Sequence, residues 1–546
     1  MSKIKIFSLG GLNEVGNNMY VVNVDDEIFI LDAGFKYADE KMLGIDYIIP
    51  NFDYLKENID KIKGIFISHG HDSQYGALPD IVSVLPDIPI YGTNFTINII
   101  KNILEEDNIK GNLNVITPHK AIEFKNVSIF PISLTHSVPG SVGYVINTKD
   151  GAIVYTSNFV FDPTASGAYK TDIGKLAYVG KQGVLCLMSE SMYADKAGYT
   201  SPKNRIEPIV METLNNVNGR VLFNIFEAQL SRIQELFDVV TLLDKKVVIL
   251  GKNLENMIND AIQNKYIEFD SERLLGLNHV NDPNVVVVIS DDREKPYSNI
   301  TRIIRGHDKF VKINENDTIM FASPSYDALE RNATHIYDEI ASLDINLVII
   351  PKQYISYHAS SEDLMMMINL MNPKYYFPVI GEYRHQVANA DCASKVGIES
   401  DNIILKLNGE VVTFVDGKLV ETDERINVSE ILVDGKTIGD VGELVLKDRE
   451  ILSDNGIVIV SATLDSKTKQ VVAGPEILTR GFIYVKDNID LIKESEKISL
   501  EVINEFNKDN TIDFNKIKLG IREKLGKYFY TETECKPMIL IVIQEV

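Results

Sequence analysis

Residues 65–79, with the sequence IFISHGHDSQYGALP, constrain the fold of this chain most. The apolar, β-branched run at the start of this stretch predicts a buried strand. His69 and His71 follow it two residues apart, so on an extended backbone both imidazoles point to the same side. Pro79 then predicts the first turn of a helix. Histidines at the carboxyl end of a strand are placed as metal ligands, whereas an isolated pair of this kind is more often two surface residues.

The size and composition of the chain restrict the class of protein. A chain of 546 residues is too long for one core, so two to four domains are expected. Cys186, Cys392 and Cys535 lie far apart and form no metal or redox motif. The apolar runs are short and the N-terminus leads directly into a strand, which predicts a cytoplasmic protein with no membrane association. A net charge of −23 excludes a broadly basic surface that coats nucleic acid, although a narrow basic channel remains compatible.

Strand and helix signals alternate through the middle of the chain. Near-continuous Val/Ile runs separated by helical segments predict an α/β fold with a parallel, doubly wound sheet. These runs cover residues 221–225, 246–251, 284–290, 317–322 and 345–351. The last part of the chain predicts a small α/β domain, with strands at GIVIVSAT, GFIYV and MILIVI and helices at 489–507 and 513–527. Three consecutive methionines, Met365 to Met367, lie in a helical stretch and are predicted to pack in a core.

Six motifs occur in an order that resembles the ribonuclease J form of the metallo-β-lactamase superfamily. They are LGGLNEVGNNMYVV, LDAG, HGHDSQYGALPD, SLTHSVP, TSNFVFD with CLMSESMYADKAGYT, and the stretch 351–384. The resemblance implies a metallo-β-lactamase αββα sandwich, an inserted β-CASP doubly wound domain and a C-terminal assembly domain. The implied boundaries are 1–207 for the first part of the sandwich, 208–351 for the insertion, 352–425 for the return to the sandwich, 426–455 for a linker and 456–546 for the C-terminal domain.

The resemblance also implies which residues hold metal. His69, His71 and His136 occupy one set of ligand positions, whereas the positions that hold or bridge a second metal carry Ser73, Gln74, Asn158 and Ile380. Two dications about 4 Å apart repel each other by on the order of 15 kcal/mol at an effective dielectric of about 20. The replaced positions supply no carboxylate to offset this repulsion. We therefore expect at most one zinc or manganese ion per chain, or none.

A loop for the RNA 5′-phosphate is implied at Tyr354, Ile355, Ser356, Tyr357 and His358. Related proteins cradle the phosphate there with backbone amides and hydroxyls, as other anion-binding loops do. Two departures stand out in this chain: Tyr354 replaces a histidine and Tyr357 replaces a glycine. Either Ser356 and His358 still contact phosphate, or the Tyr357 ring fills the pocket and the loop is only structural.

Supporting residues are implied around both sites. Asp32 is expected to support the metal loop from behind, and Glu190 takes the place of a motif aspartate. In the insertion, Ser231 stands where the resembling segment has a histidine, and the loop 290–300 also departs from its glycine-rich counterpart. The cleft edge of the insertion is therefore expected to be altered.

Together these motifs predict a ribonuclease J-type protein for RNA decay and for 5′ maturation of ribosomal and messenger RNA. The lost ligands predict weak or absent nuclease activity and a main role as a subunit of an assembly. The partner is expected to be an active paralogue, giving a hetero-oligomer, or a second copy of the chain, giving a homodimer. Other RNA-decay proteins are further expected partners. One alternative is a slow manganese-dependent 5′→3′ exoribonuclease. Another is a single-metal hydrolase of small molecules.

Overall fold

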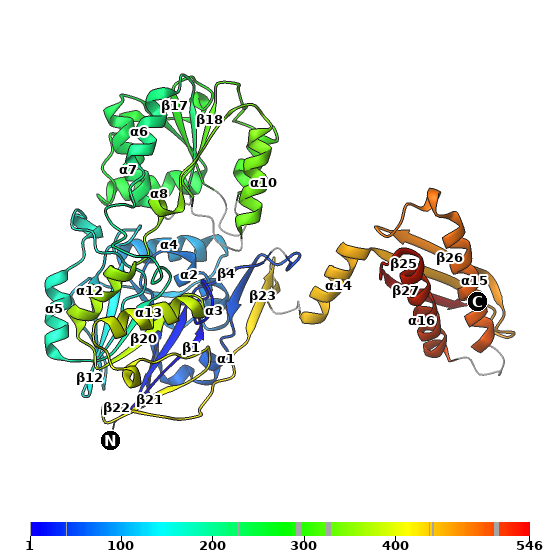
Figure 1. Ribbon diagram of the computed structural model, residues 1–546, viewed down its shortest axis with the longest axis horizontal. Helices are drawn as coiled ribbons and strands as arrows, with labels where there is room; N and C mark the ends of the chain where they lie inside the picture. Colours follow the sequence, from blue (N-terminus) through cyan, green and yellow to red (C-terminus); the bar gives the residue numbers. More distant parts are fainter. Residues whose placement is uncertain are drawn as a thin grey trace. The chain divides into compact units, whose positions relative to one another are not determined.

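The computed structural model describes residues 2–39, 41–225, 229–290, 297–323, 329–435, 437–438, 442–506 and 513–546. Its contacts divide the chain into two compact units, one of residues 1–39 with 45–438 and one of residues 40–44 with 439–546 (Figure 1). The first unit contains the sandwich and the insertion, and the second contains the C-terminal domain. No helix among these residues is long and apolar enough to cross a membrane.

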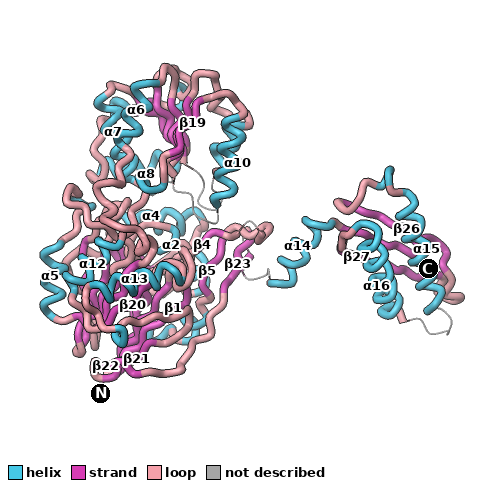
Figure 2. Tube along the Cα trace, viewed as in Figure 1, coloured by secondary structure: helices cyan, strands magenta, loops and turns pink. Residues whose placement is uncertain are grey.

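Two sheets face each other in the sandwich. The eight-stranded sheet has the order β22-β21-β1-β2-β3-β6-β7-β8, and the six-stranded sheet has the order β20-β13-β12-β11-β10-β9. Figure 2 shows the strands in magenta and the helices in cyan. The ring centroids of Tyr20 in one sheet and Tyr155 in the other lie 5.4 Å apart, and those of Phe66 and Tyr144 lie 5.6 Å apart. The core of the sandwich therefore lies between the two sheets.

The strand bounds of the first sheet are β1 Lys3–Gly10, β2 Met19–Val24, β3 Glu27–Leu31, β6 Ile62–Phe66, β7 Pro89–Gly92, β8 Asn112–Val115, β21 Val412–Val415 and β22 Lys418–Val420. Those of the second are β9 Ile122–Glu123, β10 Ser128–Ser133, β11 Val142–Thr148, β12 Gly151–Tyr155, β13 Val184–Glu190 and β20 Tyr375–Val379.

Helices cover the outer face of each sheet. Apolar side chains of α3 (Leu78–Val84) and α4 (Asn94–Glu106) pack on the first sheet. On the second sheet lie α5 (Ile173–Gln182), α12 (Ser361–Met371) and α13 (Tyr383–Lys395). The resulting order of layers is helix, sheet, sheet, helix, which confirms the predicted αββα sandwich.

The insertion is a parallel six-stranded sheet with the order β16-β15-β17-β14-β18-β19. Its strands are β14 Val221–Asn224, β15 Lys246–Leu250, β16 Leu274–Leu275, β17 Val285–Ile289, β18 Thr318–Phe321 and β19 Asn346–Ile349. Helices α7 (Leu230–Leu242) and α10 (Glu330–Ala341) lie between strands, as the sequence pattern predicts. The doubly wound parallel sheet is thus confirmed. Most of the altered loop 290–300 lies outside the described residues.

The C-terminal domain differs from the prediction at one strand. Its sheet has the order β26-β25-β27, with β25 Ile457–Leu464, β26 Val471–Arg480 and β27 Met538–Glu545. Helices α15 (Ile489–Phe506) and α16 (Phe514–Thr533) cover one face. The stretch GFIYV was expected to be a strand, but Gly481 has a φ of 68° and turns the chain, so the strand lies before it. β26 contains a Gly-Pro pair, which is tolerated because this strand lies at the sheet edge.

Residues 426–455 contain more regular structure than a linker. β23 (Glu430–Asp434) pairs with β5 (Tyr47–Pro50), so this segment extends a sheet of the first unit. Residues Glu443–Asn455 then form helix α14, which belongs to the second unit. The change from one unit to the other falls between these two elements.

Candidate metal centre and phosphate loop

Three histidines from two loops converge at one end of the sandwich. His69 and His71 lie in the loop after β6, and His136 lies in the loop after β10. A backbone hydrogen bond from Val142 to the carbonyl of Ser68, 3.0 Å long, ties the first loop to the second sheet. One ring nitrogen of each histidine can be chosen so that all three atoms lie within 4.8 Å of one another. The three side chains therefore form a cluster that fits a metal site.

Hydrogen bonds direct the free lone pairs of these rings. His136 Nδ1 lies 3.1 Å from the carbonyl oxygen of Tyr357, which can only accept, so the lone pair of His136 is on Nε2. His69 Nδ1 lies 3.0 Å from Ser68 Oγ, and His69 Nε2 is buried without a hydrogen-bond partner among the described residues. His136 Nε2 and His71 Nδ1 are 3.2 Å apart. Tetrahedral zinc with bonds of about 2.05 Å separates its ligand nitrogens by about 3.3 Å. The trio therefore fits a metal ion.

Burial keeps the three imidazoles neutral. It lowers the pKa of His71 to about 3 and the pKa values of His69 and His136 well below their ordinary range. The neighbouring rings lower the pKa of His136 further, because each ring disfavours a charge on the others. Neutral imidazole is the form that binds metal, so protons compete with an ion only in acid.

Asp32 supports the metal loop through Ser68. The Asp32 carboxylate accepts hydrogen bonds from the Ser68 amide at 2.8 Å, the Ser68 hydroxyl at 3.0 Å and the Tyr155 hydroxyl at 2.6 Å. Since Ser68 Oγ also contacts His69 Nδ1, the carboxylate orients the ring through one intervening hydroxyl. Complete burial raises the pKa of Asp32 to about 7. The carboxylate itself does not reach the histidine cluster.

The four positions at which the motif resemblance implies second-metal ligands hold neutral side chains. Ser73 donates a hydrogen bond of 2.5 Å to Gln74 Oε1, and Gln74 is fully buried. Gln74 Nε2 and Asn158 Oδ1 are buried without a hydrogen-bond partner among the described residues. Ile380 belongs to the apolar core between the sheets, with 2% of its surface exposed. None of these four side chains carries a negative charge.

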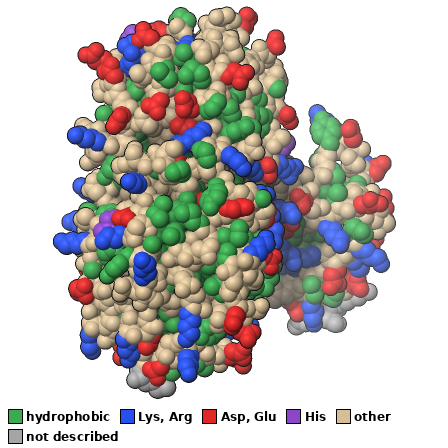
Figure 3. All heavy atoms as spheres, turned by 60° about the vertical axis from the view of Figure 1, so that its left-hand side comes forward, with side chains coloured by type: hydrophobic (Ala, Val, Ile, Leu, Met, Phe, Trp, Pro, Cys, Tyr) green, Lys and Arg blue, Asp and Glu red, His purple; other side chains and the backbone are tan. Residues whose placement is uncertain are grey.

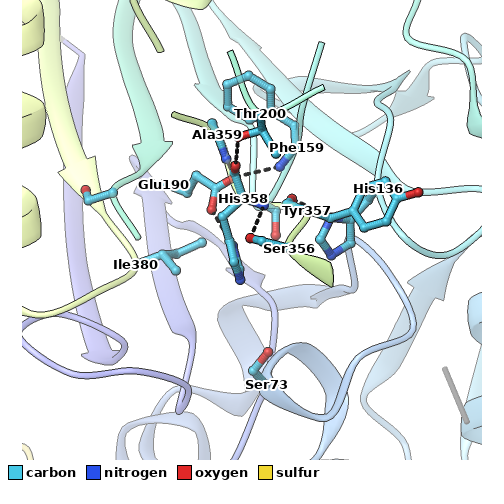
Figure 4. A network of polar contacts seen from close by, with 12 residues as sticks. Ser73, His136, Phe159, Glu190, Thr200, Ser356, Tyr357, His358, Ala359 and Ile380 are labelled. Atoms are coloured by element: carbon cyan, nitrogen blue, oxygen red, sulfur yellow. Dashed lines mark hydrogen bonds and ion pairs between the residues drawn. The ribbon is translucent and has the colours of Figure 1, made fainter. Parts of the chain in front are cut away.

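Glu190 joins the loop 354–358, the candidate phosphate loop, to the sandwich (Figure 4). Its Oε2 lies 2.8 Å from His358 Nδ1, and its Oε1 accepts hydrogen bonds from the amides of Phe159 at 2.7 Å and Ala359 at 3.0 Å. Glu190 is fully buried, whereas the His358 side chain is 27% exposed. In Figure 4 the His358 ring points into the space between Ile380, Ser73 and His136. Glu190 thus fixes the direction of this ring.

The Tyr357 ring lies against a buried arginine of the insertion. The guanidinium carbon of Arg232, on α7, is 4.3 Å from the Tyr357 ring centroid. Arg232 Nη1 donates to the carbonyl of Asn204 at 2.6 Å and to Glu235 Oε1 at 2.5 Å. Its Nε and Nη2 are buried and have no partner among the described residues. Two charged donors therefore face the interior beside this loop.

The remaining loop residues take separate positions. Tyr354 and Ile355 end a short helix, α11 (Lys352–Ile355), and Ile355 is buried in the core of the insertion. Ser356 Oγ accepts a hydrogen bond of 3.3 Å from the His358 amide, so the hydroxyl stabilises the loop itself. Arg232 was not singled out from the sequence. An arginine among the apolar residues of a predicted helix is the signal that could have found it.

Comparisons with known proteins agree with these motifs. Residues 12–174 match the metallo-beta-lactamase superfamily, 218–341 the ribonuclease J beta-CASP domain, 342–403 the Zn-dependent metallo-hydrolase RNA specificity domain, and 444–546 the ribonuclease J C-terminal domain. Ribonuclease J 2 of Staphylococcus aureus is 36% identical over 549 residues, covering 100% of this chain and 98% of the relative. Ribonuclease J 2 of Staphylococcus epidermidis is 35% identical with the same coverage.

A solved structure of a protein of unknown function from Enterococcus faecalis V583 resembles the fold. It has a TM-score of 0.52 at 15% identity and covers 76% of this chain and 100% of that chain. Full-length similarity to the ribonuclease J 2 proteins, together with the four domain matches, identifies the family. The chain belongs to the ribonuclease J family.

Proposed function

We propose that this chain is an RNA-binding subunit of a ribonuclease J assembly, acting in RNA decay and 5′ maturation, with weak or no nuclease activity of its own. The proposal rests on four residue types: Ser73, Gln74, Asn158 and Ile380 stand where the resembling motifs carry second-metal ligands, and none of them is a carboxylate or an imidazole. Two-metal hydrolysis needs a stabilised pair of cations on either side of the reacting phosphate. This centre offers ligands for one.

The three histidines fit one ion, with His69 Nε2, His71 Nδ1 and His136 Nε2 as the ligand atoms. Such an ion supplies Lewis acidity and lowers the pKa of a bound water. The protein's own contribution is to keep the rings neutral and oriented through Ser68 and Tyr357. A slow manganese-dependent exoribonuclease remains the second candidate, because the intact trio and the oriented His358 are what a residual activity would use.

The test of this proposal compares the chain alone with a mixture of the chain and a catalytically active ribonuclease J, called the active relative below. We expect little degradation of 5′-monophosphorylated RNA by the chain alone with zinc or manganese added. A rate in the mixture above that of the active relative alone would show a subunit role. If the chain alone degrades the RNA rapidly, and this activity stays with the protein through a second purification step, the nuclease alternative would be established instead.

The metal content follows from the ligand count. We expect no more than one equivalent of zinc or manganese per chain after washing with a chelator, and none in a His69→Ala/His136→Ala variant. Loss of ligands should weaken binding well beyond the ~10–100-fold effect of removing a supporting residue. Elemental analysis measures both values. Two equivalents in the washed parent protein would contradict the proposal.

Tyr357 is proposed to limit access to the guanidinium of Arg232. Since the ring lies 4.3 Å from that group, Tyr357→Gly should uncover the two donors without a partner. A hydrogen bond to a charged group contributes about 1.5–3 kcal/mol, so the preference for 5′-monophosphate over 5′-hydroxyl RNA should rise at least ~10-fold. Fluorescence anisotropy with the two RNAs measures this ratio. Tyr357→Phe, which keeps the ring, is the matched control; an unchanged ratio in Tyr357→Gly would show that no phosphate reaches Arg232.

Assembly is proposed to use the C-terminal domain. Helices α15 and α16 cover one face of its sheet, whereas the other face exposes Leu478 (46%), Leu540 (42%) and Val542 (42%). An apolar sheet face that remains open is typical of a protein contact. The domain has its own core, so the chain without residues 439–546 should stay folded and associate less. Light scattering measures the mass; an unchanged mass would count against this assignment.

A further inference from the structure

A polar hollow lies at the end of the sandwich opposite the metal centre. Strands β12, β13 and β20 run parallel to one another, and Asn158, Glu190 and Ile380 lie at or just beyond their carboxyl ends. The hollow, of about 920 Å³, lies at the amino ends of the same strands, where Gly151 and Val184 line it. Since five residues of strand span about 17 Å, the hollow and the metal centre are separate sites.

Three helices end around this hollow. α5, α12 and α13 all pack on the second sheet, and α12 contacts both of the others. Residues that follow their C-termini line the hollow, namely Gly183 after α5, Asn372 after α12 and Gly397 after α13. The last carbonyls of a helix have no partner within it, and each helix C-terminus acts as about half a negative charge. The three ends therefore make the hollow electronegative and rich in hydrogen-bond acceptors.

Two carboxylate side chains also line the hollow and lack a cationic partner in the described part of the chain. Asp150, in the turn between β11 and β12, has a buried Oδ2 without a hydrogen-bond partner among those residues. Glu399, beyond α13, makes no side-chain ion pair or hydrogen bond there. A buried acceptor without a donor lowers stability, so a ligand that donates to Asp150 would recover this free energy.

The lysines of the hollow show which kind of group it holds. Lys374 Nζ donates to the carbonyl oxygen of Gly417 at 2.6 Å, and both residues belong to the lining. Lys181, in the last turn of α5, is an exposed lining residue. In formal charge these two lysines balance the two carboxylates, so the helix ends decide the sign of the hollow. Primary ammonium groups are therefore the ligand groups that complement it.

Other classes of ligand fit this lining less well. No aromatic side chain is among the described residues that line the hollow, so a nucleobase has no ring to stack on. Within the described ranges, the group of side chains that could hold a metal ion is His69, His71 and His136, at the other end of the sandwich. The helix C-termini disfavour an anion such as phosphate. A flexible organic cation remains.

The wider surface does not supply a field of one sign. Figure 3 shows positive and negative side chains interspersed on the face turned toward the reader. With a net charge of −23 the chain attracts any polycation weakly, and this attraction is screened beyond about 8 Å at physiological ionic strength. Specific binding therefore depends on the carboxylates and carbonyls of the hollow itself.

We propose that this hollow binds a linear aliphatic polyamine of the spermidine class. Its ammonium groups bind Asp150, Glu399 and the carbonyls at the ends of α5, α12 and α13. Its methylene groups lie against Pro373 and Ile398, which also line the hollow, as the stem of a lysine lies along apolar surface. This binding uses neither the metal centre nor RNA.

Calorimetric titration of the full chain with spermidine at physiological ionic strength tests the site. We expect one saturable equivalent. Asp150→Asn should raise the Kd at least ~10-fold, because a hydrogen bond between an ammonium group and a carboxylate is lost. The matched control is Asp260→Asn, which removes an exposed carboxylate from α8 (Lys252–Gln263) of the insertion and should leave the Kd unchanged. Equal effects of the two substitutions, or no saturable binding by the parent protein, would overturn the proposal.

A change of ligand separates a specific site from a diffuse counterion effect. Putrescine, which has two ammonium groups in place of three charged nitrogens, should bind more weakly than spermidine. Magnesium chloride at matched ionic strength should not displace spermidine, because the hollow supplies acceptors for ammonium donors. Displacement by magnesium would show that the polyamine only screens the net charge of the chain, and would contradict the site.

Hydrogen exchange locates the ligand on the folded chain. Spermidine should protect the amides at the amino ends of β12, β13 and β20 and after α13, which are residues 149–151, 182–185, 372–374 and 397–402. Binding should be unchanged in the His69→Ala/His136→Ala variant, since the metal centre lies at the other end of the strands. Far-UV circular dichroism confirms that each variant is folded. Protection confined to residues 69–74, or loss of binding in that variant, would place the polyamine in the metal centre and overturn the assignment.

Discussion

The quadruple variant Ser73→Asp/Gln74→His/Asn158→Asp/Ile380→His is expected to degrade 5′-monophosphorylated RNA at least ~10²-fold faster than the parent, the scale lost with a metal's supporting residues. The substitutions restore two carboxylates and two imidazoles around the second-metal position. The fold that must receive them is already present, since the three remaining histidines converge within 4.8 Å. Activity on the RNA and metal content are measured on the same preparation.

The four substitutions should act as one unit. A single restored carboxylate or imidazole completes neither the bridge nor the second set of ligands, so each single variant should gain little, and the gains should be strongly non-additive. Tyr357→Gly in the same background is expected to open the proposed phosphate loop. A quadruple variant that folds and binds two metals but stays as slow as the parent, even with Tyr357→Gly, would show that RNA access limits the rate.

Arg220→Met is expected to destabilise the insertion by about 3–5 kcal/mol, the effect of leaving one member of a buried ion pair without its partner. Arg220 Nε and Nη2 donate to the two carboxylate oxygens of Asp317 at 2.8 and 2.7 Å, and both side chains are about as buried as the core. Its Nη1 also donates to the carbonyl of Val280 at 2.7 Å. These bonds connect the segments that precede β14 and β18.

The loss of stability should be confined to the insertion. It is therefore measured by amide hydrogen exchange in β14 and β18 rather than by thermal unfolding of the whole chain. Arg305→Met is the matched control: Arg305 makes a two-point ion pair with Glu339 on the surface, and its removal should change little. The double variant Arg220→Met/Asp317→Leu should recover much of the loss, because no buried charge is left alone. A uniform increase in exchange over the whole chain would contradict the local role.

The predictions from sequence succeeded where a periodic pattern determines the structure. The Val/Ile runs of the insertion all became parallel strands. For β14, β15, β17 and β18 this follows because a run buried on both faces has few other arrangements, whereas β19 lies at the sheet edge and is partly exposed. GFIYV failed because its β-branched and aromatic composition resembles a strand, whereas Gly481 starts a turn. β26 was missed since its Gly-Pro pair argues against a strand, and only its place at the sheet edge permits it.

The site was predictable only in part. The histidine cluster could be predicted because His69 and His71 lie in one local motif and His136 lies in a second motif that resembles the family. Residue type and the order of the motifs were sufficient to predict it. The contact of Tyr357 with Arg232 joins residues that are 125 positions apart in the chain and cannot be inferred from either segment alone. The predicted core packing of the three consecutive methionines is confirmed for Met367, which is fully buried, and for Met366, which packs against the same core. Met365 is half-buried, because neighbours on a helix point to different sides and the tertiary structure decides which side is covered.

The backbone at Ile380 has a consequence for how this centre can change. Ile380 has a φ of 57°, and its amide donates to the Tyr20 hydroxyl at 3.1 Å. A β-branched residue is strained in this left-handed conformation, whereas histidine and asparagine adopt it more readily. Apolar burial therefore favours isoleucine here while the main chain disfavours it, and the two contributions partly cancel. Substitution of Ile380 by histidine should therefore cost less stability than the loss of its apolar burial alone would suggest, so the main chain does not oppose this one of the four changes.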